Sequence, residues 1–244
     1  MILKAQQVEP HRRLWTKEEY YRLGDLGLFQ GQKVELLAGE IWIQYPRDHK
    51  APELPYPSEE PHPRLWTKAE YYRLADLGFF LGQKAELLGG EIMVTSPQNW
   101  PHSSAVDAAA DMLRQSWAGA WVREQAPLDL GLVIEPEPDV SVVAGRRLNY
   151  TAHPTTALLV IEVSDNTLVY DRTGKASLYA AGGVADYWII NLVQLQLEVY
   201  RQPVPDPSQT HGHRYADSAV YFRGQTITPL AAPSLAIAVA DLVP

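Results

Sequence analysis

The spacing of apolar residues in the second half of the chain alternates between the period of a helix and that of a strand. Residues 103–119 carry apolar side chains at helical spacing behind a capping Ser103 or Ser104. Residues 172–181 predict a second helix, which ends at Gly182-Gly183. Short runs rich in β-branched and aromatic residues predict strands at 120–126, 128–134, 138–144, 157–164, 185–192, 196–202, 215–222 and 226–230.

The run at 157–164 is almost continuously apolar, which indicates a buried central strand. The runs at 185–192 and 196–202 are close enough to form a hairpin around 193–194. The pattern therefore predicts an α/β (α+β) domain with a mixed, antiparallel-rich sheet flanked by helices.

The first half of the chain contains one segment twice. Residues 9–41 recur as residues 60–92, and 26 of the 33 aligned positions are identical. In each copy a Thr followed three residues later by a Glu predicts a capped helix, and the segment VELLAGEI or AELLGGEI then predicts a hairpin. We divide the chain into a duplicated N-terminal helix–hairpin segment at 1–45, a Pro-rich linker at 46–63 and a main domain at 64–244.

The second copy runs directly into the main domain, so we expect it to fill the native position in that fold. The first copy is surplus. Three dispositions stay open for it: docking on a sheet edge, pairing with another chain, or hanging on its linker. It is also a candidate for a regulatory or oligomerisation arm.

The composition excludes several kinds of chemistry. The chain has no cysteine, which removes disulfides, thiolate zinc sites and cysteine nucleophiles. We find no signal peptide and no apolar run that would span a bilayer, so we expect a cytoplasmic protein without a membrane partner.

The net charge of −8 argues against tight, autonomous binding of nucleic acid, because proteins that neutralise phosphates are usually basic. It leaves open a metal-dependent nuclease, in which the metal supplies positive charge at the phosphate.

Two acids and a lysine are the main candidates for a functional site. Asp139 opens a strand directly after a proline, and Glu162 lies inside the apolar run LLVIEVS, where a charge is costly unless it is paired or bound to a cation. Lys175 lies on the helix that follows this strand and is a candidate to point back at Glu162. For an isolated Pro-Asp or a helical lysine, a purely structural role is the more common one.

These residues belong to a pattern that resembles a known family. The segments AELLGGEI, PDVSVV, LLVIEVSDNT and DRTGKASLYAAGGVADYWII, with His102, resemble the Uma-two family of the PD-(D/E)XK nuclease superfamily. The similarity covers roughly residues 64–244. It implies a restriction-endonuclease-like core and Mg²⁺-dependent hydrolysis of phosphodiester bonds in DNA, with Mn²⁺ as an alternative metal.

The resemblance assigns the metal-binding acids to Asp139 and Glu162. In the wider superfamily a lysine lies two residues after the second acid, where this chain has Ser164, whereas the Uma-two pattern has a lysine on the next helix, which matches Lys175. Glu86 and His102 match an acid in the family's hairpin and a histidine before its first core helix.

We therefore expect Asp139, Glu162 and the backbone carbonyl of Val163 to bind Mg²⁺. Lys175 would assist water activation or stabilise phosphate charge, and Glu86 and His102 would line the site. Cutting both strands with one site per chain would need a homodimer. The alternative is a nuclease-fold protein that cuts weakly or not at all and binds nucleic acid or a protein partner.

Overall fold

A six-stranded sheet forms the centre of the computed structural model, which describes residues 10–44, 60–95, 98–131 and 133–244. Its strands lie in the order β12-β11-β10-β9-β8-β7. Their bounds are β7 Ala120–Glu124, β8 Val140–Ala144, β9 Leu159–Ser164, β10 Asp186–Asn191, β11 Gln196–Pro205 and β12 His213–Tyr221. Only β9 and β10 run parallel, so the sheet is mixed and antiparallel-rich, which confirms the predicted fold class.

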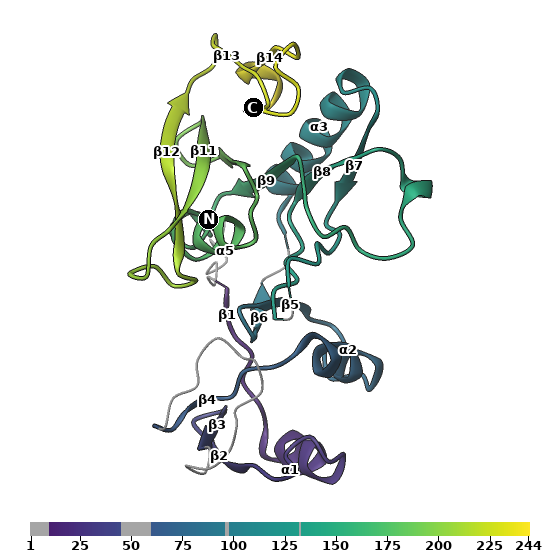
Figure 1. Ribbon diagram of the computed structural model, residues 1–244, viewed down its shortest axis with the longest axis vertical. Coiled ribbons are helices and arrows are strands. Elements are labelled where there is room, and N and C mark those ends of the chain that lie inside the picture. The colour runs from purple at the N-terminus through teal and green to yellow at the C-terminus, as the bar shows by residue number, and fades with distance from the viewer. Residues whose placement is uncertain (1–9, 45–59, 96–97, 132) are drawn as a thin grey trace, which may run out of the picture.

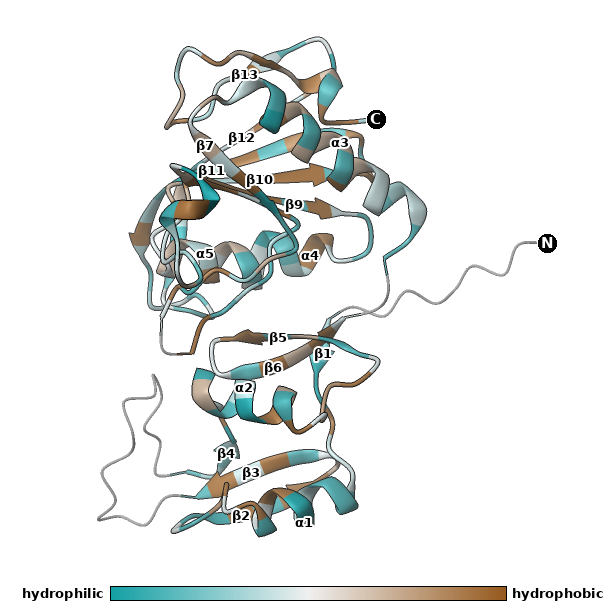
Figure 2. Ribbon diagram, turned by 90° about the vertical axis from the view of Figure 1, so that its right-hand side faces the viewer, coloured by the Kyte–Doolittle hydropathy of each residue, from teal (hydrophilic) through white to brown (hydrophobic). Residues whose placement is uncertain are grey.

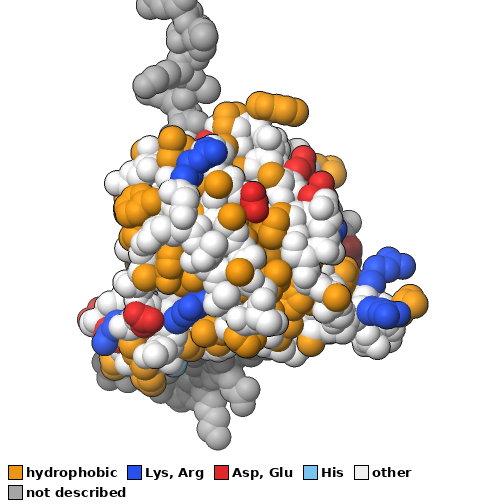
Figure 3. Space-filling view, turned by 90° about the horizontal axis from the view of Figure 1, so that it is seen from above, with side chains coloured by type: hydrophobic (Ala, Val, Ile, Leu, Met, Phe, Trp, Pro, Cys, Tyr) orange, Lys and Arg blue, Asp and Glu red, His pale blue; other side chains and the backbone are white. Residues whose placement is uncertain are grey.

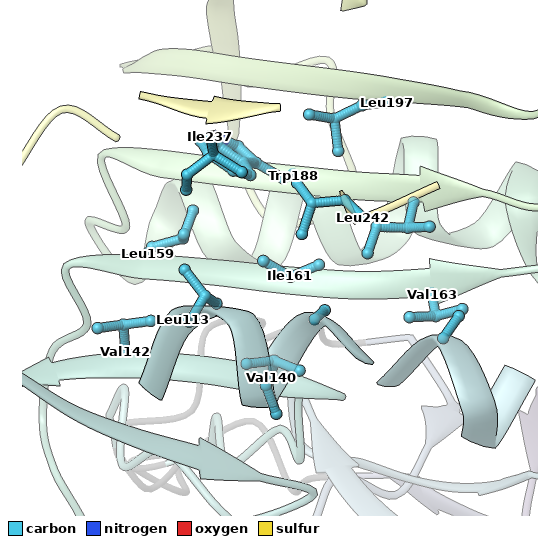
Figure 4. Close-up of a cluster of buried hydrophobic side chains, with 14 of the residues drawn as sticks. Leu113, Val140, Val142, Leu159, Ile161, Val163, Trp188, Leu197, Ile237 and Leu242 are labelled. Carbon is cyan, nitrogen blue, oxygen red and sulfur yellow. The ribbon is translucent and has the colours of Figure 1, made fainter. Parts of the chain in front are cut away.

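Helices cover both faces of this sheet (Figure 2). Helix α3, Trp100–Ser116, packs on one face, while α4, Leu168–Tyr170, and α5, Ala176–Ala181, lie on the other. The C-terminal hairpin of β13, Thr226–Ile227, and β14, Ile237–Ala238, joins the side of α3. Figure 4 shows Leu113 of α3 beside Val142 and Leu159 of the sheet.

The alternation of side chains along β8 and β9 directs the candidate acids to one face. Val140, Ile161 and Val163 belong to the core beneath α3. Their neighbours Asp139 and Glu162 therefore point to the opposite face, where α4 and α5 lie. The charged positions are buried because the sheet is covered there as well.

Three expected elements differ in the structure. Helix α3 begins at Trp100 rather than at 103, because the Asn99 side chain accepts a 3.0 Å hydrogen bond from the backbone N–H of His102 and caps it. The helix expected at 172–181 already starts at Leu168 and contains one π-helical turn, Asp171–Lys175. Such an extra residue per turn often marks a functional site.

The strand expected at 128–134 does not form in the described part of that segment. Leu128 is fully buried, and its backbone N–H donates to the carbonyl of Pro136 at 3.0 Å instead of to a neighbouring strand. The apolar character that predicted a strand serves to cover the α5 side of the core.

The two copies of the repeat form two small units below the main sheet (Figure 1). Within each, a nine-residue helix with a Thr–Glu capping box precedes a hairpin, as expected. The first copy contains β1 His11–Arg12, α1 Lys17–Asp25, β2 Lys33–Leu37 and β3 Glu40–Gln44; the second contains β4 His62–Pro63, α2 Lys68–Asp76, β5 Lys84–Leu88 and β6 Glu91–Thr95.

Strand β1 of the first copy pairs with β6 of the second copy, so the surplus copy docks on a sheet edge. Most of the linker expected at 46–63 lies outside the described residues; its end, His62–Pro63, is a strand that pairs with β3. Among the described residues, no helix is long and apolar enough to cross a membrane.

Candidate functional site

All five candidate side chains line one cavity of about 70 Å³. Glu86 comes from β5, His102 from α3, Asp139 from the start of β8, Glu162 from β9, and Lys175 from the π-helical turn. Val163 also lines this cavity. The structure thus brings together residues that are up to 89 positions apart.

Asp139 is held by donors on both carboxylate oxygens. Its Oδ2 accepts a 2.9 Å hydrogen bond from the backbone N–H of Val163, and its Oδ1 lies 3.1 Å from His102 Nε2 and 3.2 Å from Gln98 Nε2. Burial alone would raise the pKa of Asp139, but His102, Lys175 and the Val163 N–H together lower this pKa to about 2. Asp139 is therefore ionised at neutral pH.

Glu162 interacts with two donors from the opposite helix. Its Oε1 accepts hydrogen bonds from Lys175 Nζ at 2.9 Å and from the Tyr179 hydroxyl at 2.5 Å. Burial raises the pKa of Glu162, and the neighbouring Asp139 charge adds to this effect, whereas Lys175 opposes it. A second positive charge near Glu162 would therefore favour its ionised form.

Lys175 is buried, and burial by itself would lower its pKa. The surrounding carboxylates, Glu162 first among them, outweigh this effect and raise the pKa of Lys175 well above its ordinary value. The ammonium group therefore keeps its proton at neutral pH and acts as a fixed positive charge.

A glycine helps to place this lysine. A Cβ added at Gly174 would lie 2.7 Å from the ring of Tyr170, too close for any other residue without displacing that ring. Tyr170 lies one turn earlier on the same helical segment. The contact keeps the π-helical turn compact just before Lys175.

Glu86 occupies the edge of the cavity nearest the hairpin. Its Oε2 accepts a 3.4 Å hydrogen bond from the backbone N–H of Glu137, and its Oε1 lies 3.9 Å from Lys84 Nζ. Glu86 is buried. It thus adds negative charge to the cavity from a direction different from that of Asp139 and Glu162.

Several other residues line the cavity that the sequence did not single out. Asp165 and Thr167 follow β9, and Gln98 and Asn99 precede α3. Asp171 is also buried at the cavity, and burial raises its pKa. Their position in the sequence could have identified some of them, because polar residues that directly follow a buried strand, such as Asp165, often lie at a functional site.

The donor set suits a hard divalent cation. Five carboxylates line the cavity with two lysines and one histidine, so oxygen ligands and negative charge predominate. In the described parts of the chain no three His, Asp or Glu side chains are already grouped to hold a metal ion. Two carboxylates with a backbone carbonyl and waters are a sufficient set for Mg²⁺, and the cavity has room for several waters.

The tail histidines lie elsewhere. Within the described residues, the His211–His213 pair is not part of a metal-binding group, and His211 lies against Gly89 of the hairpin turn.

Comparisons with known proteins identify one family. The sequence model of the Uma2 family, described as "Putative restriction endonuclease", matches residues 69–240. No functionally curated protein matches the sequence. Among solved structures, the chain is similar to one described as "a putative nuclease belonging to DUF820" from Anabaena variabilis ATCC 29413, with 19% identity and a TM-score of 0.49 over 65% of this chain and 88% of that chain.

Proposed function

The chain belongs to the Uma2 family, whose model matches more than half of its length, and on this premise we propose that it is a Mg²⁺-dependent endonuclease acting on DNA. The observation that carries the proposal is the meeting of Asp139, Glu162 and Lys175 at one cavity. Two buried carboxylates beside a buried ammonium group are expensive to maintain for stability alone.

Asp139, Glu162 and the backbone carbonyl of Val163 would hold the metal, with Mn²⁺ as a substitute for Mg²⁺. When bound, the cation supplies Lewis acidity toward the phosphate and lowers the pKa of a coordinated water. The pKa of Glu162 is raised first by burial and then by the neighbouring Asp139 charge, and a bound cation would offset both effects, which supports this assignment.

The chain's own residues have separate parts in the reaction. Lys175, which keeps its proton, stabilises the negative charge that develops on the phosphate. His102 and the Val163 N–H fix the orientation of Asp139. Glu86 sits where it can position a water at the edge of the cavity.

DNA would approach the cavity mouth rather than the end of the molecule that carries β13 and β14. That end, seen from above in Figure 3, displays many apolar and uncharged side chains and few lysines or arginines. With a net charge of −8, the chain would bind duplex DNA weakly without metal.

The test is cleavage of supercoiled plasmid with Mg²⁺, Mn²⁺ or EDTA. We expect metal-dependent nicking that is lost in Asp139→Ala and in Lys175→Ala. The matched control is Asp217→Ala, because Asp217 is an exposed acid on β12 far from the cavity lining. Cleavage that persists in both site variants would contradict the assignment.

A second candidate function, a nuclease-fold binding module that does not cut, is favoured by one observation. Both oxygens of Asp139 and both oxygens of Glu162 already accept hydrogen bonds from protein donors, which a metal would have to displace or share. Calorimetry with Mn²⁺ separates the two, since only the nuclease requires a metal complex. A homodimer and a cytoplasmic location remain predictions under either function.

A further inference from the structure

The two copies of the repeat exchange their leading strands. Strand β1 of the first copy pairs with β6 of the second, matching His11 with Val94. Strand β4 of the second copy pairs with β3 of the first, matching His62 with Ile43. Equivalent residues of the two copies are 51 positions apart, so His11 corresponds to His62 and Ile43 to Val94. The two pairings are therefore equivalent, with the roles of the two copies reversed.

Arginine side chains repeat this reversal. Arg13 donates to the carbonyl of Phe79 at 2.8 Å, and its counterpart Arg64 donates to the carbonyl of Leu28 at 3.1 Å. A second pair of arginines on the helices behaves in the same way: Arg22 donates to Leu77 at 3.0 Å, and Arg73 donates to Leu26 at 2.8 Å.

The centre of the contact is formed by a residue and its own counterpart. The rings of Trp15 and Trp66 lie 5.0 Å apart, within one hydrophobic core that both copies share. A small cavity of about 30 Å³ lies beside them, and each residue of its lining has its counterpart in the same lining: Arg12 and Pro63, Arg13 and Arg64, Trp15 and Trp66, Glu40 and Glu91, Ile41 and Ile92.

Contacts that recur with exchanged roles define a twofold interface between identical surfaces. Such an interface normally joins two chains. Here both surfaces belong to one chain, and Arg13 and Arg64, which cross the interface, are buried.

The first copy also carries an uncovered version of the hairpin surface. Leu88 of the second copy is 3% exposed because it packs against the α5 side of the main domain, whereas its counterpart Leu37 is 48% exposed. Glu86 lines the main cavity, and its counterpart Glu35 is exposed. The surface that would receive a second main domain is therefore present on the first copy.

We propose that the second copy can pair with the second copy of another chain to form a dimer. In this protein the first copy of the same chain occupies that position instead. The strand-exchange face of residues 60–95 is thus a self-complementary dimerisation surface that residues 10–44 keep closed. The first copy also reaches the main cavity through Pro10, and in a dimer of second copies Pro61 of the other chain would take this position.

One difference between the copies predicts how strong such a dimer is. Arg12 forms ion pairs with both Glu40 and Glu91, but its counterpart in the second copy is Pro63. In a dimer of second copies, the two Glu91 carboxylates would face each other without this arginine. The closed, single-chain arrangement is consequently favoured over the dimer.

The experiment opens the face in the intact chain. Leu23 is fully buried in the first copy, and Leu23→Asp places a charge in its core, which should unfold that copy. Sedimentation equilibrium over a concentration series should then show a twofold increase in particle mass relative to the unmodified chain. The matched control is the double variant Leu23→Asp with Leu74→Asp, which damages the equivalent core position in both copies and should give no increase.

Two further measurements make the result specific. The chain has no cysteine, so a single introduced cysteine can be cross-linked selectively. Glu91→Cys combined with Leu23→Asp should give a covalent dimer with a short bismaleimide. Two controls should give none: Glu91→Cys alone, and Asp217→Cys combined with Leu23→Asp. Adding Pro63→Arg should strengthen the dimer about tenfold, since two new ion pairs form with Glu91.

The proposal is overturned if Leu23→Asp keeps the particle mass of the unmodified chain while circular dichroism shows a folded main domain. It is equally overturned if Leu23→Asp associates but gives no cross-link through Glu91→Cys. It is also overturned if the double variant Leu23→Asp with Leu74→Asp associates with the same strength.

Discussion

The ammonium group of Lys175 lies 2.9 Å from Oε1 of Glu162, so a helix and a central strand are joined by a buried ion pair. The strand ends at Ser164 and the lysine follows eleven residues later, at the end of one π-helical turn. This turn carries the lysine inward to the carboxylate, where the wider superfamily places a lysine on the strand itself.

Charge at position 175 should matter more than the shape of the side chain. Lys175→Met is expected to lower plasmid cleavage about 10²- to 10³-fold, because it removes the positive charge beside the reacting phosphate. Lys175→Arg should recover part of the rate, and only part, since a planar guanidinium does not fit a buried ammonium site well. Initial nicking rates at fixed Mg²⁺ measure both, and full activity of Lys175→Met would exclude the electrostatic role.

The Tyr179 hydroxyl should affect activity as well as stability. Tyr179→Phe removes the donor to Glu162 while keeping the ring, and we expect about tenfold slower cleavage with about 1 kcal/mol lower stability. Tyr215→Phe is the matched control, because its buried hydroxyl donates to the carbonyl of Val184, away from the cavity. The control should lose similar stability but keep its cleavage rate; equal rates in the two variants would contradict a role for Tyr179 at the site.

Metal binding should be visible without any DNA. At a Mn²⁺ concentration one hundred times the Kd, the free energy of unfolding should rise by about 2.7 kcal/mol, and the melting temperature with it. Asp139→Asn should abolish the shift and Asp217→Asn should leave it intact. A shift of the same size in Asp139→Asn would place the metal elsewhere.

Glu198 should make stability depend on pH in the acid range. Burial alone would raise its pKa, but hydrogen bonds from Arg172, Asn191, Gln196 and Tyr200 lower this pKa to about 2. A carboxylate with a lowered folded-state pKa stabilises the fold above its unfolded pKa of about 4.3, and this contribution disappears as the pH falls toward 2.

We therefore expect Glu198→Gln to be less stable than the unmodified chain by about 2 kcal/mol at pH 7. The difference should narrow between pH 4.5 and pH 2, because protonation then favours the unfolded chain until the pH reaches the folded-state pKa of Glu198, about 2. Chemical denaturation at several pH values measures it. A gap that stays constant down to pH 2 would show that the effect comes from packing rather than charge.

Much of the fold was accessible from periodicity. The central strand around Glu162, the hairpin after it and the helix–hairpin of each repeat follow from patterns that local physics governs. The strand predicted at 128–134 was wrong, because a loop that buries one side has the same alternation of apolar and polar residues as a short strand. The π-helical turn could not be predicted from the sequence, because one extra residue barely changes the helical spacing of apolar positions.

Several residues that line the candidate cavity were predictable from the sequence, but their contacts were not. A charge inside an apolar strand singled out Glu162. The positions of Asp139 and Lys175 around it made them candidates, and the resemblance supplied Glu86 and His102. The partners Gln98 and Tyr179 depend on how α3 and α5 cross the sheet, which no local pattern encodes. The exchange of strands between the repeats could not be predicted either. Two nearly identical sequences predict the same local structure, but they do not show whether each leading strand pairs within its own copy or with the other copy.

The reciprocal hydrogen bonds of Arg13 and Arg64 have a kinetic consequence. A contact between two chains forms at a rate that falls with dilution, whereas two halves of one chain meet at an effective concentration fixed by their connection. Duplicating the segment would therefore make assembly independent of how much protein the cell contains. The cost is stoichiometric: each such module then carries one cavity instead of two, so this interface no longer brings two cavities together on one duplex.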